Sequence, residues 1–478
     1  MISISKINEV YIKIDAPRGI CQELSERFTF DVPNAKFSPK YKQKIWDGKI
    51  RLFSLSTNLI YFGLLNNVIE FFNDNNYPYE LDFKINTKEL ENQEEFIKSI
   101  NLAKEYTVRD YQWNALLHAI DNNRATFISP TSSGKSLTIY LIARFFNKKT
   151  LIIVPTTNLV IQLAKDFIEY GFDKNKIHQI YDGNSKHSDK DITISTWQSI
   201  YKEDEDYFNQ YNLVVGDEVH NFKANSLIEI MKKLVNCKYR FGLTGTLDDI
   251  SSNELTISGL FGPIYNVIST KTLMDNKIIS DLKIKCVVLN YPKDIKAKVS
   301  KLDYVSEQKF LIQCKPRNKF ITNLVNSLDG NTLVLYKFVD AHGKILYDMI
   351  KEKNKEREVF FVSGKVKIDE REKIRNDIED ISNGVIVASY NTFSTGINIK
   401  NLKYIIFASP TKSKIRNLQS IGRGLRKHKD KDYATLYDIS DNLSFYGKNN
   451  ISLDHFLVRI ELYNREKFNY KIYNHNLK

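Results

Sequence analysis

A run of small and polar residues at positions 129–136, Ser-Pro-Thr-Ser-Ser-Gly-Lys-Ser, separates two apolar segments. Residues 125–128 before the run predict a buried strand, and residues 137–142 after it predict a helix. A loop of small residues lets backbone N–H groups converge on a phosphate chain, and the following helix directs the positive end of its dipole to the same place. In such a loop Lys135 would reach the β- and γ-phosphates and the Ser136 hydroxyl would ligate Mg²⁺. Taken alone, the run is a weak signal, because an ordinary turn before a helix has a similar composition.

An acidic pair strengthens this interpretation. Residues 211–216 predict a second buried strand, and Asp217-Glu218-Val219-His220 follows at its carboxyl end. At that position Asp217 would hold Mg²⁺, and Glu218 would orient and polarise an attacking water. The alternative is a pair of exposed carboxylates that cap the next helix. With the phosphate loop upstream, the pair indicates nucleotide hydrolysis.

Three further motifs follow in order along the chain. They are Thr244-Gly245-Thr246, Ser394-Thr395-Gly396 and the run Gln-Ser-Ile-Gly-Arg-Gly-Leu-Arg at 419–426. Arg423 and Arg426 are three residues apart, so they share one face of a helix. Such a pair can present guanidinium groups to a γ-phosphate that another domain holds. By itself, the pair could equally be a basic helix face exposed to solvent.

The order of these motifs resembles that of the superfamily-two helicases and translocases. More closely, nearly the whole chain resembles the UvsW-type helicases of T-even-like phages. The segments that carry this closer resemblance are 46–52, 153–157, 216–218, 387–390, 393–397, 412–415 and 466–470. The resemblance implies an ATP-dependent DNA helicase that acts on Holliday junctions, stalled forks and R-loops in phage recombination, repair and replication. A translocase or RNA-directed remodeller without strand separation is the alternative. A basic DNA-binding scaffold with an inactive ATPase fold is disfavoured, because Lys135, Glu218 and Arg426 are all present.

The fold class expected is α/β. Apolar strands that alternate with helical segments predict parallel sheets covered by helices. We expect two tandem RecA-like motor domains, at 104–275 and 276–445, after a small α/β domain at 1–103. Residues 446–478 are expected to form a helical tail, with a helix from Leu453 to Phe468.

Site roles come from the resemblance, residue by residue. ATP would contact Arg109, Gln112 at the adenine edge, Ser132, Ser133, Gly134, Lys135, Ser136 and Gly396, and Lys135, Asp217, Glu218, Gln419, Arg423 and Arg426 would be catalytic. His220, Thr244 and Thr246 would couple hydrolysis to movement, whereas His118 and His342 are interpreted as structural. A DNA strand would contact Thr156, Thr196, Lys337, Ser363 and Thr392. Hydroxyl and ammonium groups suit phosphates, so tracking is expected to be nearly independent of base sequence. One departure is Ser132, where many superfamily-two loops have glycine.

Two lysine-rich segments leave alternatives open. In the small domain, Lys36, Lys40, Lys42, Lys44, Lys49 and Arg51 alternate with Phe37, Tyr41, Trp46 and Phe53. Cations beside aromatic rings can grip phosphates and stack on bases. We favour core packing for Trp46 and Phe53 and DNA contact for some of the lysines. The stretch from Lys283 to Lys319 could contact DNA or be a solvated connector between the domains.

Composition limits the setting in which the chain works. The formal net charge of +13 favours polyanionic partners. No apolar stretch is long enough to cross a bilayer, the first residues do not have the pattern of a secretory signal, and the four cysteines show no paired spacing. We therefore expect a cytoplasmic protein without membrane contact. The resemblance implies that this cytoplasm is that of an infected bacterial host, and we expect the protein to be a monomer. The expected cofactors are ATP and Mg²⁺, and the expected partners are branched DNA, RNA–DNA hybrids and recombination or single-strand-binding proteins.

Overall fold

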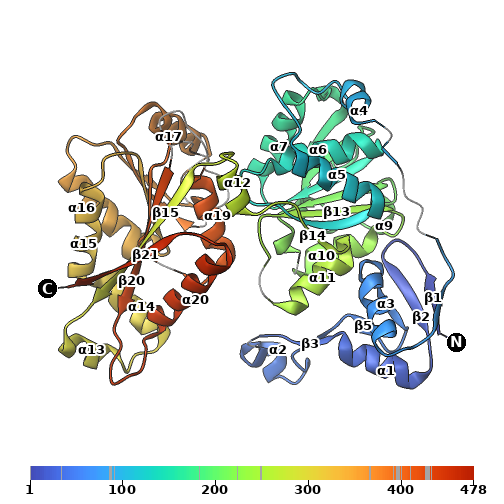
Figure 1. Ribbon diagram of the computed structural model, residues 1–478, viewed down its shortest axis with the longest axis horizontal. Helices are drawn as coiled ribbons and strands as arrows, with labels where there is room; N and C mark the ends of the chain where they lie inside the picture. The colour runs from blue at the N-terminus through green and yellow to red at the C-terminus, as the bar shows by residue number, and fades with distance from the viewer. Residues whose placement is uncertain are drawn as a thin grey trace. The chain divides into compact units, whose positions relative to one another are not determined.

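The computed structural model of the chain is shown in Figure 1. It describes residues 2–33, 35–84, 89–90, 92–181, 183–222, 224–247, 250–364, 366, 368–390, 392–393, 399, 401–409, 411–425, 431 and 433–477. These residues form two compact units. The first unit comprises residues 1–129 and 134–267, and the second comprises residues 130–133 and 268–478.

A small mixed α/β domain begins the first unit. Strand β2 (Tyr11–Asp15) alternates between buried and more exposed side chains and buries Ile12 and Ile14 on one face. The five-stranded sheet has the order β5-β6-β2-β1-β7, and a separate pair, β3-β4, carries the basic and aromatic segment. The other elements of this domain are β1 (Ile2–Lys6), α1 (Arg18–Arg27), β3 (Thr29–Asp31), the short 3₁₀ helix η1 (Ala35–Phe37), α2 (Pro39–Lys42), β4 (Lys49–Arg51), β5 (Phe53–Ser54), β6 (Leu59–Tyr61), η2 (Phe62–Leu64), α3 (Leu65–Asp74) and β7 (Tyr79–Leu81).

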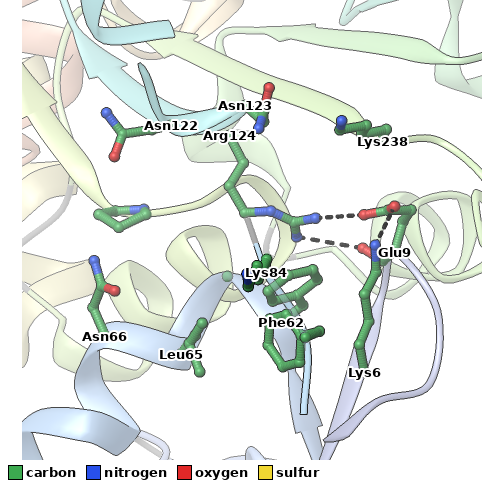
Figure 2. A pocket seen from close by; sticks show the side chains of 13 residues that line it. Lys6, Glu9, Phe62, Leu65, Asn66, Lys84, Asn122, Asn123, Arg124 and Lys238 are labelled. Atoms are coloured by element: carbon green, nitrogen blue, oxygen red, sulfur yellow. Dashed lines mark hydrogen bonds and ion pairs between the residues drawn. The ribbon is translucent and has the colours of Figure 1, made fainter. Parts of the chain in front are cut away.

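Two glycines let this small domain pack closely on the next one. A side chain at Gly63 would lie 2.1 Å from the Ser258 carbonyl oxygen, and one at Gly259 would lie 2.8 Å from the Tyr61 ring. Nearby, Arg124 Nη2 donates to Glu9 Oε2 at 2.9 Å, and its guanidinium lies 3.8 Å from the centre of the Phe62 ring. Figure 2 shows these side chains converging beside a pocket. The small domain is therefore fixed to the start of the first parallel sheet.

The first parallel sheet has seven strands in the order β10-β11-β9-β12-β13-β8-β14. Its central strands are continuous runs of buried apolar residues, which is typical of a sheet covered on both faces. Strands β8, β13 and β12 are neighbours, so their carboxyl ends meet at one edge. The elements are α4 (Gln93–Ser99), α5 (Asp110–Asn122), β8 (Arg124–Ile128), α6 (Lys135–Phe146), β9 (Thr150–Val154), α7 (Thr157–Glu169), η3 (Lys174–Lys176), β10 (Ile177–Ile180), β11 (Ile192–Thr196), α8 (Trp197–Ile200), α9 (Glu205–Phe208), β12 (Leu213–Asp217), η4 (Val219–Asn221), α10 (Asn225–Lys233), β13 (Tyr239–Thr244), α11 (Ser251–Phe261) and β14 (Ile264–Asn266).

A second seven-stranded parallel sheet has the order β17-β18-β16-β19-β20-β15-β21. The two parallel sheets and the small domain before them confirm the fold class predicted from the sequence. The elements are α12 (Thr270–Asp275), β15 (Asp281–Asn290), α13 (Lys293–Val299), α14 (Tyr304–Gln313), α15 (Lys315–Asn326), β16 (Thr332–Tyr336), the π-helical turn η5 (Val339–Gly343), α16 (Lys344–Lys353), β17 (Val359–Val362), α17 (Ile368–Asp380), β18 (Val385–Ser389), β19 (Tyr404–Phe407), α19 (Lys414–Gly424), β20 (Tyr433–Asn442), α20 (Ile451–Arg465) and β21 (Tyr470–Asn476).

Tertiary packing specifies the position of three segments more closely than the sequence pattern does. Helix α4, assigned by sequence to the small domain, packs its Phe96 ring against Trp113 and Phe145 of the first parallel-sheet domain. The lysine-rich stretch from Lys283 begins within β15, so that part of it is neither a connector nor a free surface loop. The final residues form helix α20, as expected, and then strand β21, which extends the second sheet beside β15. The tail therefore belongs to the second domain.

Candidate active site

Two residues with positive φ lie in the loop between β8 and α6. Gly134 has φ of 84° at the N-terminus of α6, and Ser132 has φ of 71°. Positive φ costs an L-residue other than glycine about 1 kcal/mol. Ser132 therefore keeps the turn that glycine would make more easily. Ser133 supports the same loop, because its hydroxyl donates to the Pro130 carbonyl at 2.7 Å.

Gln112 joins this loop to helix α5. Its side chain is buried, its Nε2 donates to the Gly134 carbonyl at 3.2 Å, and its Oε1 accepts from the Arg109 backbone N–H at 3.0 Å. The Arg109 guanidinium donates to the Tyr111 hydroxyl at 3.0 Å. The amide that the resemblance assigns to the adenine edge thus touches the phosphate loop directly.

Four of the expected side chains meet at the carboxyl edge of the first parallel sheet. Lys135 Nζ lies 3.8 Å from Glu218 Oε1 and 3.4 Å from the Ser129 carbonyl, to which it donates. His220 Nδ1 lies 3.4 Å from Glu218 Oε2 and 3.0 Å from the Thr244 hydroxyl. These contacts join the ends of β8, β12 and β13. A cation, a carboxylate and an imidazole held together in this way can bind a phosphate chain and activate a water molecule.

Backbone strain accompanies this cluster. Glu218 has φ of 51°, a left-handed conformation that is uncommon outside glycine and that clusters at functional sites. Its backbone N–H donates to Asp217 Oδ1 at 2.9 Å, which holds the two carboxylates on either side of one peptide. Thr244 also donates to the Thr246 carbonyl at 2.9 Å, so the motif after β13 is tied to the same network.

Asp217 and Ser136 have the ligand chemistry of a magnesium site. Burial and the neighbouring Glu218 charge raise the pKa of Asp217 to about 6, although Lys135 acts in the opposite direction. A carboxylate in this state is one that a divalent cation would stabilise, and hydroxyl and carboxylate oxygens are ligands that Mg²⁺ prefers. Ser136 shares a hydrogen bond of 2.8 Å with the Tyr170 hydroxyl, a partner with no signal in the sequence. The residues fit the ion.

The raised pKa of Asp217 makes a testable prediction about pH. Mg²⁺ would bind the ionised carboxylate and not the protonated acid, so Mg–ATP affinity is expected to fall as pH drops through about 6, with proton release on binding near that pH. The raised pKa of Asp217 also lowers the free energy of unfolding as pH rises from about 4 to about 6, because Asp217 loses its proton at a lower pH in the unfolded chain than in the folded protein. Fluorescent-nucleotide titration between about pH 5 and pH 8 measures the affinity. The Asp217→Asn variant is the control, since any pH step that it retains belongs to the nucleotide. An unchanged step in that variant contradicts the prediction.

The expected strand contacts also lie at carboxyl ends of strands, in each unit separately. Thr196 ends β11 and shares a hydrogen bond of 2.9 Å with Ser199. Thr156 follows β9, and within the described part of the chain its buried hydroxyl has no hydrogen-bond partner. In the second unit the expected residues follow β16, β17 and β18: Lys337, Ser363 and Thr392.

The remaining expected residues belong to the second unit. Gln419 is partly buried on α19, and Arg423 lies on the same helix. Gly396, Arg426 and the Arg423 side chain fall outside the residues that the structure describes. No group of three or more His, Cys, Asp or Glu side chains suited to a metal occurs within the described ranges.

Comparison with known proteins places this geometry in a family. Residues 2–82 match the family described as DNA helicase UvsW, N-terminal, residues 105–249 match Type III restriction enzyme, res subunit, and residues 316–428 match Helicase conserved C-terminal domain. The chain is 35% identical to the ATP-dependent DNA helicase uvsW of Enterobacteria phage T4 over 98% of both chains. It is 28% identical to the DNA 3'-5' translocase XPB2 of Sulfurisphaera tokodaii over 74% of this chain and 86% of that protein. The crystal structure of T4 UvsW covers 100% of both chains at 33% identity with a TM-score of 0.51.

Proposed function

The chain belongs to the UvsW family of ATP-dependent DNA helicases, and we propose that it remodels branched DNA during phage recombination, repair and replication. The substrates proposed are four-way junctions, stalled forks and R-loops, the last of which contain an RNA–DNA hybrid. The observation that carries the proposal is the cluster of Lys135, Glu218, His220 and Thr244 at one sheet edge, in a chain similar over its whole length to a DNA helicase.

In the proposed reaction Lys135 would hold the β- and γ-phosphates, and Asp217 with Ser136 would hold Mg²⁺. The ion would neutralise charge that develops on the γ-phosphate. Glu218 orients the attacking water, and the short contact between His220 and Thr244 links this carboxylate to the motif after β13. We propose that Arg109 and Gln112 contact ATP at its adenine base. In the second unit, we propose that hydrolysis also requires Gln419, Arg423, Arg426 and Gly396.

The groups proposed to contact the DNA strand are hydroxyl and ammonium groups, which bind phosphates and do not distinguish one base from another. They are Thr156, Thr196, Lys337, Ser363 and Thr392. The Thr156 hydroxyl supports this assignment, because a buried donor without a partner among the described residues is costly unless a ligand or water satisfies it.

The small domain offers a second DNA surface. Phe37, Tyr41 and Ile45 are 66%, 41% and 72% exposed between β3 and β4. The lysines interspersed with them along the chain are Lys36, Lys40, Lys42, Lys44 and Lys49. Phe53 is buried in the domain core, as predicted, and Trp46 is half-buried with its indole N–H donating to the Lys49 carbonyl at 2.8 Å. Exposed rings with lysines suit unpaired bases and phosphates together. This surface favours DNA that has both duplex and single-stranded parts.

Strand displacement on a panel of substrates tests the function. The panel consists of a fork, a four-way junction, an RNA–DNA hybrid and plain duplex DNA, each with and without Mg–ATP. We expect ATP-dependent strand separation that is fastest on the branched substrates. ATP hydrolysis stimulated by DNA without strand separation would instead support the alternative, a translocase, which the similarity to a DNA translocase also favours.

Replacing Phe37 with alanine is expected to weaken binding to forks by about fivefold or more, because stacking of one base contributes roughly 1–3 kcal/mol. Fluorescence anisotropy with fork and plain duplex measures the change, and duplex binding should change less. Tyr446→Ala is a matched control, since this tyrosine is 93% exposed but lies in the second unit. An equal loss in both variants would contradict a role for the small domain.

We propose that the chain acts as a monomer in the cytoplasm of the infected bacterial cell, together with recombination or single-strand-binding proteins. Within the described residues, no helix has the length and apolar character needed to span a bilayer.

A further inference from the structure

A buried histidine follows strand β16 of the second sheet. His342 is fully buried on η5, whose π-helical turn is closed by the Gly343 backbone N–H donating to the Phe338 carbonyl at 2.9 Å. Any side chain at Gly343 would lie 2.5 Å from the Tyr336 ring, which stacks on Phe361 with 5.7 Å between ring centres. Short π-helical turns are rare and occur mostly at functional positions. The turn therefore depends on close packing at the carboxyl edge of the sheet.

The hydrogen bonds of this imidazole have a defined direction. Burial lowers the pKa of His342 to about 3, so the ring is neutral near pH 7, with one donor and one acceptor nitrogen. Nε2 lies 3.2 Å from Asn318 Oδ1, an atom that can only accept, so Nε2 carries the proton. Nδ1 then accepts from the Ser409 hydroxyl at 2.7 Å. The Asn318 amide is fixed in turn, because its Nδ2 donates to the Ile312 carbonyl at 2.9 Å.

The bond to Ser409 joins two segments that leave the sheet at the same edge, and the bond to Asn318 anchors the imidazole on helix α15. One segment begins at Lys337 directly after β16 and contains His342. The other begins at Ala408 and Ser409 after β19 and leads to α19, which carries Gln419. A second link holds the same strand end, because Arg317 Nη2 donates to the Ala408 carbonyl at 2.9 Å while its Nε donates to Asp441 Oδ1 at 2.8 Å.

We propose that His342 is a positioning residue that couples a DNA contact at Lys337 to the helix that carries Gln419. The proposal rests on the functions proposed for Lys337 and Gln419. His342 lies on the turn after β16, is anchored on α15 through Asn318, and accepts the Ser409 hydrogen bond, so displacement of that turn also displaces Ser409. A shift of the turn after β16 on DNA binding is thus transmitted to α19 through Ser409.

The test compares His342→Ala with His342→Gln in the full-length chain. Measurements are the ATPase rate without DNA, the maximal rate with single-stranded DNA, and the DNA concentration that gives half of the stimulation. We expect His342→Ala to keep its basal rate within about twofold and to lose about tenfold of the DNA stimulation. Glutamine retains a carbonyl acceptor and an N–H donor, so His342→Gln is expected to recover most of the stimulation.

Two further variants test whether the hydrogen bond between His342 and Ser409 carries the coupling. Ser409→Ala removes the other partner of the 2.7 Å bond and is expected to reproduce the loss. The double variant His342→Ala with Ser409→Ala is then expected to be no worse than His342→Ala alone, because both changes break one interaction. His475→Gln is the matched control, since this histidine is exposed on β21 and its ring packs on Phe320, outside the two segments that His342 joins.

Three results would overturn the proposal. The first is a folded His342→Ala variant whose DNA stimulation equals that of the wild type. The second is a parallel fall of basal rate, stimulated rate and melting temperature that glutamine does not rescue, which would indicate a purely structural residue. The third is a wild-type ATPase that DNA does not stimulate, which would overturn the proposed helicase function itself and is distinguished by the wild-type measurement alone.

Discussion

The Lys135→Ala variant is expected to hydrolyse ATP at least about 10²-fold more slowly than the wild type, because one preorganised cationic donor to the developing γ-phosphate charge is lost. Lys135 Nζ faces Glu218 Oε1 at 3.8 Å and lies at the start of α6, where the phosphate chain is proposed to bind. Burial and the Glu218 charge raise the pKa of Asp217, and the Lys135 ammonium partly offsets that rise. Removing it leaves Glu218 and Asp217 without this neighbouring positive charge.

Phosphate release at saturating Mg–ATP, with and without DNA, measures this loss, and thermal unfolding checks the fold. Lys149→Ala is a matched control, because Lys149 is also partly buried in the first unit and donates to a backbone carbonyl, that of Ser188, at 2.7 Å. It precedes β9 and lies at the opposite end of that strand from Thr156. A Lys135→Ala preparation that keeps more than a tenth of the wild-type rate would contradict the assignment of the phosphate loop.

The Arg459→Met variant is expected to lose roughly 3–5 kcal/mol of unfolding free energy, because it leaves a buried carboxylate without its cation. Arg459 and Asp438 are both fully buried, and two hydrogen bonds of 2.8 Å join them. Burial acts to lower the pKa of Arg459, but the Asp438 charge and these hydrogen bonds more than offset it, so the pKa is raised. The pair ties helix α20 to strand β20, and Tyr463 adds a hydrogen bond of 3.0 Å to Asp438.

Adding Asp438→Asn to Arg459→Met separates charge from packing. Asparagine keeps an acceptor for Tyr463 but removes the unpaired charge, so the double variant is expected to recover part of the lost stability. Chemical denaturation, followed through the unfolding transition of the second unit, gives the free energy of unfolding of each variant. Equal stability of both variants and the wild type would mean that residues after 450 contribute little to the second sheet.

Local pattern predicted most strands and helices of the fold, including the strands before the phosphate loop and before Asp217. Both strands are buried segments followed by polar residues, so their positions are evident from the sequence, whereas the roles of those polar residues are proposed from their chemistry and from the family. Strand β21 could not be predicted in this way, because its side chains are mostly polar and exposed at a sheet edge. Its place is determined by backbone pairing with β15, which leaves no hydrophobic pattern.

The sequence by itself determined which side chains are available for ATP hydrolysis and on which strand ends they lie, because strand and helix periodicity is a local property of neighbouring residues. Only the tertiary structure decided which of those ends meet. The order β12-β13-β8 brings Glu218 and Thr244 beside Lys135, and the order β16-β19 lets His342 reach Ser409 across 67 residues. Strand order depends on how helices and strands that are far apart in the chain pack together. A pattern of neighbouring residues therefore does not predict it.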